Sequence, residues 1–174
     1  MGKIEFILDP VSHITADAIG KPGQRVFYLQ GRTDTQIVSV IIEKFQLQSL
    51  IESIMHFLGD IQSKFPELSE PIIAYRENEM QLQPPIDPVF RAGDLGLEYD
   101  SARDLVCIIA KEIIPEDSDE EQGFVRYWCT RPQLLALIKY GASVIEQGRP
   151  ICPQCGEPMD PSGHFCPRKN GHKH

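Results

Sequence analysis

The chain has no long hydrophobic run, and this excludes a membrane-spanning helix. Its most apolar run, Leu105 to Ala110, is only six residues long, whereas a helix needs about 20 to cross a bilayer. The N-terminal stretch Met1 to Phe6 also lacks the apolar core and cleavage site of a signal peptide. We therefore expect a cytoplasmic protein with no membrane partner.

Positive charge is scarce in most of the chain. Residues 1–150 carry 14 Lys and Arg against 23 Asp and Glu, and the 174-residue chain has a net charge of −8. Phosphate contacts made by Lys and Arg supply most non-specific affinity for nucleic acid, so the acidic body argues against a phosphate-coating protein. Residues 151–174 instead hold 3 Lys and Arg against 2 Asp and Glu, with three histidines. This basic tail leaves a local nucleic-acid contact open.

Familiar catalytic motifs are also missing. The loop from Gly20 to Arg25 offers glycines, backbone amides and two cations, which are the ingredients of an anion-binding nest. It lacks the Gly-Lys-Ser/Thr spacing of a P-loop and the helix that should follow. Lys21, Gly23 and Arg25 are the anion-binding candidates, and a plain turn that leads into a strand is the simpler interpretation.

The hydrophobic pattern predicts an α+β fold with antiparallel sheets and two helices. Apolar residues recur at three- and four-residue steps from Gln46 to Phe65 and again from Pro132 to Gln147, as in amphipathic helices. Pro66 ends the first, and Pro132 suits the first turn of the second. Residues 9–24 are interpreted as a loop. The expected strands cover residues 3–8, 25–30, 36–44, 89–99, 104–114 and 124–129, with a further short strand possible at 72–75.

The order of these elements suggests an internal duplication. Residues 46–51 and 133–138 align without gaps and are identical at four of six positions. We expect two β-β-β-α units, residues 1–65 and 88–147, joined by a Pro-rich connector within an α+β domain of residues 1–149. Chance similarity between two amphipathic helices is the alternative, because such helices share one pattern.

The most specific motif lies in residues 150–174, which we interpret as a zinc-binding tail. Tetrahedral zinc takes four N or S ligands, and the pair Cys152 and Cys155 can supply two from one turn. Cys166 is the third candidate, and either His164 or His172 is the fourth. A thiol-disulfide pair is the alternative, but the thioredoxin-like βαβ context of such a motif is absent. Five cysteines, an odd number, also favour a reducing compartment.

A site closed by four protein ligands would be structural, because a catalytic zinc keeps one position open. If His164 were not a ligand, an open position would exist and metal-assisted catalysis would be the alternative. A tail this short cannot build its own core, so bound Zn²⁺ would supply its folding free energy.

Several segments together resemble an uncharacterised bacterial family of actinobacterial type, in the domain-of-unknown-function series (about 3090 in that series). The segments are residues 20–30, 43–46, 90–93, 148–155 and 163–171. The resemblance covers nearly the whole chain, and its tail motif is Cys-Pro-x-Cys followed by Asp-Pro-x-Gly-His-x-Cys-Pro-Arg-x-Asn-Gly-Tyr. It implies His164 as the fourth ligand and makes His172, which stands where the family has tyrosine, a reserve. It implies no activity, substrate or partner.

The expected function is that of a cytoplasmic binding or adaptor protein, with the structural zinc tail as a contact surface for another protein. An enzyme that holds an anionic small molecule between the two repeats, through Lys21, Arg25 or Arg91, is one alternative. Single-strand nucleic-acid binding on the sheets is another, by analogy of fold alone. The acidic body disfavours nucleic acid as a partner.

Overall fold

The structure is built from two β-sheets and two long helices. It is a computed structural model that describes residues 3–73, 75–147 and 154. In chain order the elements are β1 (Glu5–Leu8), β2 (His13–Ile19), β3 (Val26–Arg32), β4 (Ile37–Ile42), α1 (Lys44–Lys64), the short 3-10 helix η1 (Glu77–Glu79), β5 (Ala92–Asp100), β6 (Leu105–Glu112), β7 (Phe124–Cys129) and α2 (Arg131–Gln147). The predicted α+β class is confirmed, and both helices form close to where the apolar periodicity places them.

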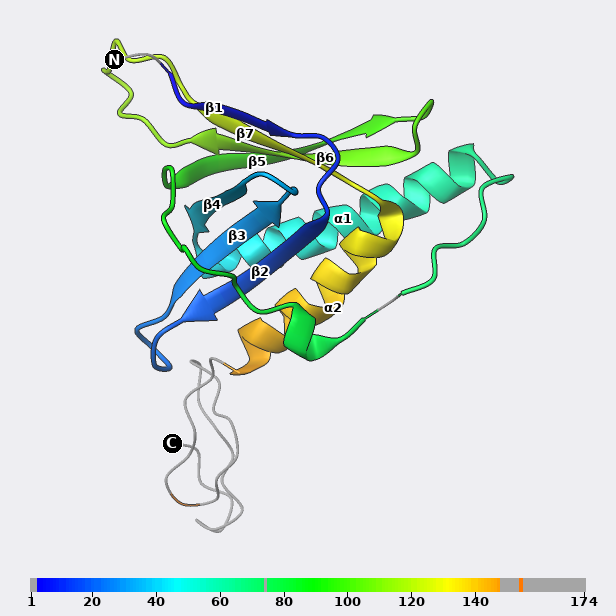
Figure 1. Ribbon diagram of the computed structural model, residues 1–174, viewed down its shortest axis with the longest axis horizontal. Helices are drawn as coiled ribbons and strands as arrows, with labels where there is room; N and C mark the ends of the chain where they lie inside the picture. Colours follow the sequence, from blue (N-terminus) through cyan, green and yellow to red (C-terminus); the bar gives the residue numbers. More distant parts are fainter. Residues whose placement is uncertain (1–2, 74, 148–153, 155–174) are drawn as a thin grey trace.

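The seven strands form one mixed sheet and one antiparallel sheet. The first has the order β1-β7-β6-β5 and the second the order β2-β3-β4 (Figure 1). Within the first sheet β1 runs parallel to β7, with Leu8 opposite Tyr127. The prediction of purely antiparallel sheets is therefore wrong for this pair. The chain leaves β1 for the other sheet instead of turning back in a hairpin, which removes the antiparallel constraint on β1.

Strand β2 lies where the sequence analysis expected a loop. Ile14 and Ala16 are buried on the face toward the core, and Thr15 between them is buried on the opposite face. The period-two alternation of a strand is thus present in the sequence. The sequence does not reveal this strand, because its outer face carries polar residues that are buried only by contacts with the distant connector. Thr15 donates a hydrogen bond to the Met80 carbonyl, and the Leu82 amide donates to Asp17.

The connector between α1 and β5 covers this polar face. Thr15, Gln30 and Ser39 form one cross-strand row on β2, β3 and β4, and all three are buried. The Gln30 amide donates to the Ser39 hydroxyl and to the Gln83 carbonyl, both at 3.0 Å, and accepts from the Gln83 amide at 2.9 Å. Residues 72, 73 and 75 lie in no strand, so the additional short strand is not formed by the described residues.

Tyr127 and Gly31 join the two sheets at the centre of the core. The side chain of Tyr127 is fully buried, and its hydroxyl donates to the Val38 carbonyl of the other sheet at 3.2 Å. A Cβ atom at Gly31 would lie 2.4 Å from Cδ1 of the Tyr127 ring. Real Cβ atoms do not approach a ring carbon so closely, so the tyrosine ring requires glycine on the facing strand.

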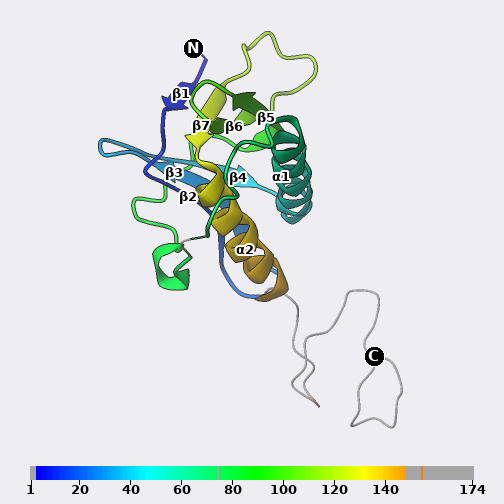
Figure 2. The same cartoon turned by 90° about the vertical axis from the view of Figure 1, so that its right-hand side faces the viewer.

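Each helix packs against a strand of the sheet that it does not follow in the chain. α1 follows β4 but lies along β5, whereas α2 follows β7 but packs against β2. The helices also pack on each other, and Figure 2 shows them on the same side of the strands. At their contact a Cβ on Gly141 would lie 3.2 Å from Cδ1 of Ile51. No helix in the described part of the chain is long and apolar enough to span a bilayer.

Candidate functional site

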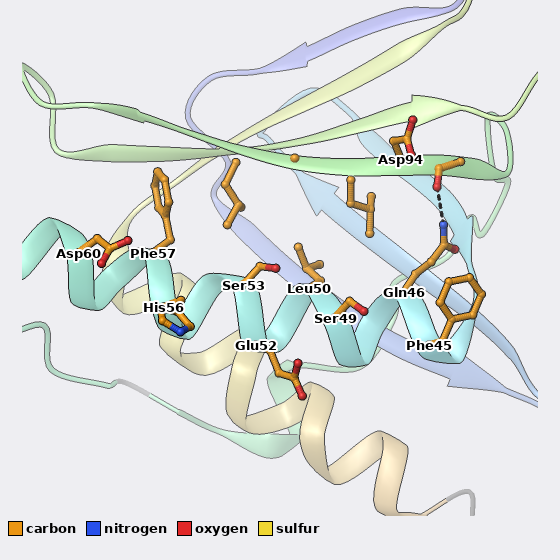
Figure 3. A pocket seen from close by; sticks show the side chains of 14 residues that line it. Phe45, Gln46, Ser49, Leu50, Glu52, Ser53, His56, Phe57, Asp60 and Asp94 are labelled. Atoms are coloured by element: carbon orange, nitrogen blue, oxygen red, sulfur yellow. Dashed lines mark hydrogen bonds between the residues drawn. The ribbon is translucent and has the colours of Figure 1, made fainter.

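A groove lies between α1 and β5 (Figure 3). Its volume is about 660 Å³, within the size range of ligand sites. One wall is a stripe of α1 that includes Phe45, Gln46, Ser49, Ser53, Phe57 and Asp60. The other wall is residues 93–97 of β5, which is the edge strand of its sheet.

The helix wall exists because α1 buries its opposite stripe. Leu47, Ile51 and Ile54 point into the core, which leaves the neighbouring stripe free to face β5. Gln46 fixes the helix at one end of the groove. Its side-chain oxygen accepts from the Glu43 amide at 2.7 Å, and its Nε2 donates to the Ala92 and Gly93 carbonyls at 3.2 and 2.8 Å.

Small residues line the middle of the groove on its helix side. Ser49 and Ser53 are exposed there, and the half-buried Leu95 and Leu97 line the facing side of β5. Phe45 stands at one end with 65% of its surface exposed, which is unusual for a phenylalanine in a folded protein. A lining formed by a helix stripe and an extended strand suits an elongated occupant better than a compact one.

The charge of the groove is negative. Glu52, Asp60 and Asp94 line it, and no Lys or Arg is among the lining residues that the structure describes. Arg91 lies near the groove but its guanidinium is held by Glu43 at 2.7 Å. A cationic ligand would therefore find counter-charges here, and an anionic one would be repelled.

A second hollow of about 510 Å³ continues along α1 and shares Phe57 and Asp60 with the groove. Its far wall includes Tyr99, whose ring packs on Phe65 with 5.8 Å between centroids. The Tyr99 hydroxyl donates to Oδ1 of Asp104 at 2.8 Å. Burial, with this hydrogen bond, raises the pKa of Tyr99 to about 12, so the hydroxyl remains protonated at neutral pH.

Asp104 also holds Arg131, a buried residue that sequence analysis missed. Nε and Nη2 of Arg131 donate to the two oxygens of Asp104 at 2.9 and 3.0 Å, and Nη1 donates to the Ser69 carbonyl at 3.1 Å. One sequence signal could have revealed the pair. Arg131 opens a helix, where the helix dipole disfavours a cation unless a carboxylate accompanies it. The arrangement ties α2, the β5–β6 turn and the connector together, and we assign it a structural role.

The predicted zinc ligands Cys152, Cys155, His164 and Cys166, and the reserve His172, lie outside the described residues. Their zinc site remains a prediction. Within residues 3–73 and 75–147, no group of three or more His, Cys, Asp or Glu is arranged to hold a metal ion.

The anion-binding candidates lie apart from the groove. Lys21, Gly23 and Arg25 form the exposed turn between β2 and β3, where the Gln24 amide donates to the Lys21 carbonyl at 2.9 Å. Gly23 has φ = 86°, as a glycine in a tight turn can. The Arg25 guanidinium lies over the Phe27 ring, 4.8 Å from its centroid. The structure thus places these residues in a plain hairpin turn and does not bring them together with Arg91, which precedes β5.

Two cysteines of the body are core residues with unreactive thiols. Cys107 and Cys129 are both fully buried, and burial raises the pKa of Cys107 to about 11 and that of Cys129 well above its usual range. Because the thiolate is the nucleophile, a shift from 9.0 to about 11 lowers the reactive fraction of Cys107 about a hundredfold.

We expect iodoacetamide at neutral pH to label Cys107 and Cys129 at least about a hundredfold more slowly in the folded chain than in guanidinium chloride. Mass spectrometry of tryptic peptides resolves these two thiols from the three in the tail. Equal rates in the folded and unfolded chains would contradict the burial of both thiols.

Comparisons with known proteins identify the family of the chain. No curated protein and no solved structure matches it. One family model does match, and it covers residues 6–166, which include most of β1, all the other strands and helices of the described residues, and the four proposed metal ligands. The chain belongs to this family, DUF3090, a family described as proteins of unknown function.

Proposed function

We propose that the chain is a binding protein that contacts another protein through the groove between α1 and β5. The observation that carries this proposal is the edge strand β5, which no described strand pairs with on its outer side and which faces a groove of about 660 Å³. Groove residues come from an exposed helix stripe with an exposed phenylalanine at one end. Such edges and aromatic anchors are what protein partners use.

The two alternative functions find less support in the groove. An enzyme for an anionic small molecule needs cations around its substrate, but the described residues that line the groove include three carboxylates and no Lys or Arg. Single-strand nucleic-acid binding on the sheets needs free basic residues beside aromatic ones. Lys3, Arg103 and Arg126 do lie over the rings of Phe124 and Trp128, but each of these cations is paired with a carboxylate. A protein partner is favoured because it can present cationic or neutral groups.

We further propose that Cys152, Cys155, His164 and Cys166 hold a structural Zn²⁺ in the tail, and that the tail adds a second contact surface. The support is the ligand types and their spacing in the sequence. The cytoplasm, a reducing compartment, suits such thiolate ligands.

The order of elements favours a duplicated unit. β2-β3-β4-α1 and β5-β6-β7-α2 are each an antiparallel three-stranded meander followed by a helix. We propose that they arose by duplication, with β1 as an addition outside the repeat.

A pull-down with full-length variants tests both contact surfaces. Ser53→Trp fills the groove from an exposed position, Gln48→Trp is its control on the same helix outside the groove, and Cys152→Ser/Cys155→Ser removes two zinc ligands. We expect a partner captured by the wild type and by Gln48→Trp to be lost with Ser53→Trp. Metal analysis of the same samples should give about one zinc per wild-type chain and none in the double Cys variant.

The outcomes separate the proposals. Equal capture by all variants would overturn the groove as a contact site. Loss of capture only in the Cys variant would place the contact in the tail. Wild-type protein purified without zinc, and unable to take it up, would overturn the metal site.

A further inference from the structure

We propose that the groove between α1 and β5 binds an extended, basic peptide segment, which joins the sheet as an additional strand beside β5. This inference rests on the proposed function and specifies the kind of partner. It follows from the state of the β5 edge, from the dimensions of the groove and from its charge.

The first argument is the open edge of β5. β5 pairs with β6 on one side, and no other strand within the described residues pairs with its outer side. Alternate residues of an edge strand direct N–H and C=O groups outward, which makes the edge a template for another strand. The segment that precedes β5 already has backbone hydrogen-bond partners, because the Val89 amide donates to the Ser39 carbonyl and the Ile41 amide donates to the Phe90 carbonyl.

Protection of the edge ends where the groove begins. Gln46 covers the carbonyls of Ala92 and Gly93, and a register irregularity falls between Ala92 and Asp94. From Asp94 to Asp100 the pairing with β6 is regular. Edge strands are commonly protected by bulges and side-chain caps, and here both occur at one end only, which leaves the regular part available.

The second argument is size. The five lining residues of β5 span about 16 Å at about 3.3 Å per residue, and the helix wall from Gln46 to Asp60 spans about 21 Å at 1.5 Å per residue. The groove therefore accommodates a strand of about five or six residues.

The third argument is charge and polarity. An added strand points its side chains alternately to the two faces of the sheet. One set would meet the half-buried Leu95, Leu97 and Phe57, and the other would meet solvent beside Asp94. The set on the Asp94 face lies beside that carboxylate, Asp60 adds a second one at the helix wall, and no Lys or Arg is among the described lining residues. A segment that alternates Lys or Arg with apolar residues therefore complements the groove.

The test uses fluorescence anisotropy with the full-length protein and three labelled octapeptides. The first alternates Lys and Val, the second alternates Glu and Val, and the third is the Lys-Val peptide N-methylated at every second residue. We expect the Lys-Val peptide to bind at least about tenfold more tightly than either of the others. N-methylation keeps the charge but removes the hydrogen bonds along one edge, so it separates strand addition from electrostatic attraction alone.

Two variants locate the peptide. Asp60→Lys/Asp94→Lys should weaken the Lys-Val peptide about tenfold or more, whereas Asp117→Lys/Asp119→Lys makes the same charge change in the exposed loop before β7 and should alter affinity less than twofold. Ser53→Trp should abolish binding. Amide hydrogen exchange by NMR should show new protection for alternate residues of β5 and none for the turn between β2 and β3.

Several results would overturn the inference. These are equal affinities for the N-methylated and plain peptides, binding undiminished by Ser53→Trp, absence of new protection in β5, or protein dimerisation through β5 in place of peptide binding. If they occur while Ser53→Trp still removes a captured partner, the groove remains a protein-binding site and only the extended basic occupant is wrong. If Ser53→Trp removes no partner, the proposed function fails instead.

Discussion

Replacing Tyr127 with alanine is expected to lower the free energy of unfolding by about 3–5 kcal/mol, the range for aromatic residues removed from a well-packed core. Tyr127 is fully buried, with no solvent-accessible surface, and it contacts both sheets. Domains of this size have a total stability of about 5–15 kcal/mol. Urea denaturation followed by circular dichroism measures the change, and a loss below about 1 kcal/mol would contradict the central position of this ring.

Two further variants show which part of Tyr127 matters. Tyr127→Phe keeps the ring and leaves the Val38 carbonyl without its donor, so we expect a loss of only about 1 kcal/mol. Gly31→Ala should cost about 1–3 kcal/mol in the wild type, since its Cβ meets the ring. In the Tyr127→Ala background the same change should cost much less, because the opposing ring is gone. Additive losses in this double-mutant cycle would refute the contact.

Replacing Asp104 with alanine is expected to cost about 3 kcal/mol, because it leaves the guanidinium of Arg131 buried without its carboxylate. The Arg131 side chain is 7% exposed and that of Asp104 is 36% exposed, so the value belongs at the lower end of the range for buried pairs. Asp100→Ala is the matched control. It removes an exposed ion pair with Arg103 and two exposed hydrogen bonds from the amides of Ala102 and Arg103, so we expect a loss of about 1–2 kcal/mol, below that of Asp104→Ala.

The same pair predicts a dependence of stability on pH. Burial alone would raise the pKa of Asp104, but the hydrogen bonds from Arg131 and Tyr99 outweigh it and leave the pKa below the ordinary 3.8. A carboxyl whose pKa is lowered on folding contributes stability above its unfolded pKa and loses it as the pH falls through the folded pKa. Acidification below about pH 4 should therefore destabilise the wild type more than Asp104→Ala. Parallel losses in the two proteins would contradict this.

The features that could be predicted from sequence are those set by local pattern. The apolar stripe of α1 has one helical period throughout and ends at Pro66, and Pro132 marks the start of α2. The extent of α1 and the start of α2 each depend on residues that are close together in the chain, so both can be predicted from the sequence pattern. β2 shows the opposite case. Its outer face is polar, and what covers Thr15 is Met80, 65 residues away, so the buried state of that face is not encoded locally.

The candidate site shows the same division. The proposed zinc ligands lie within fifteen residues of each other and are recognisable by spacing alone. The groove joins residues 45–60 of α1 to residues 93–97 of β5, and these segments meet only because α1 packs along a strand of the sheet that it does not follow in the chain. Ser49 and Ser53 carry no signal in sequence, because small residues are equally common on any exposed surface.

The parallel pairing of β1 with β7 has a consequence for the order in which the fold can be completed during synthesis. Leu8 lies opposite Tyr127, and 119 residues separate them along the chain. When a nascent chain has emerged from the ribosome only as far as α1, the second sheet is complete, but β1 has no partner strand and α1 has no strand to lie along. Sheet β1-β7-β6-β5 closes only after both ends of the body have been made, and contacts so distant in sequence are the slowest to form.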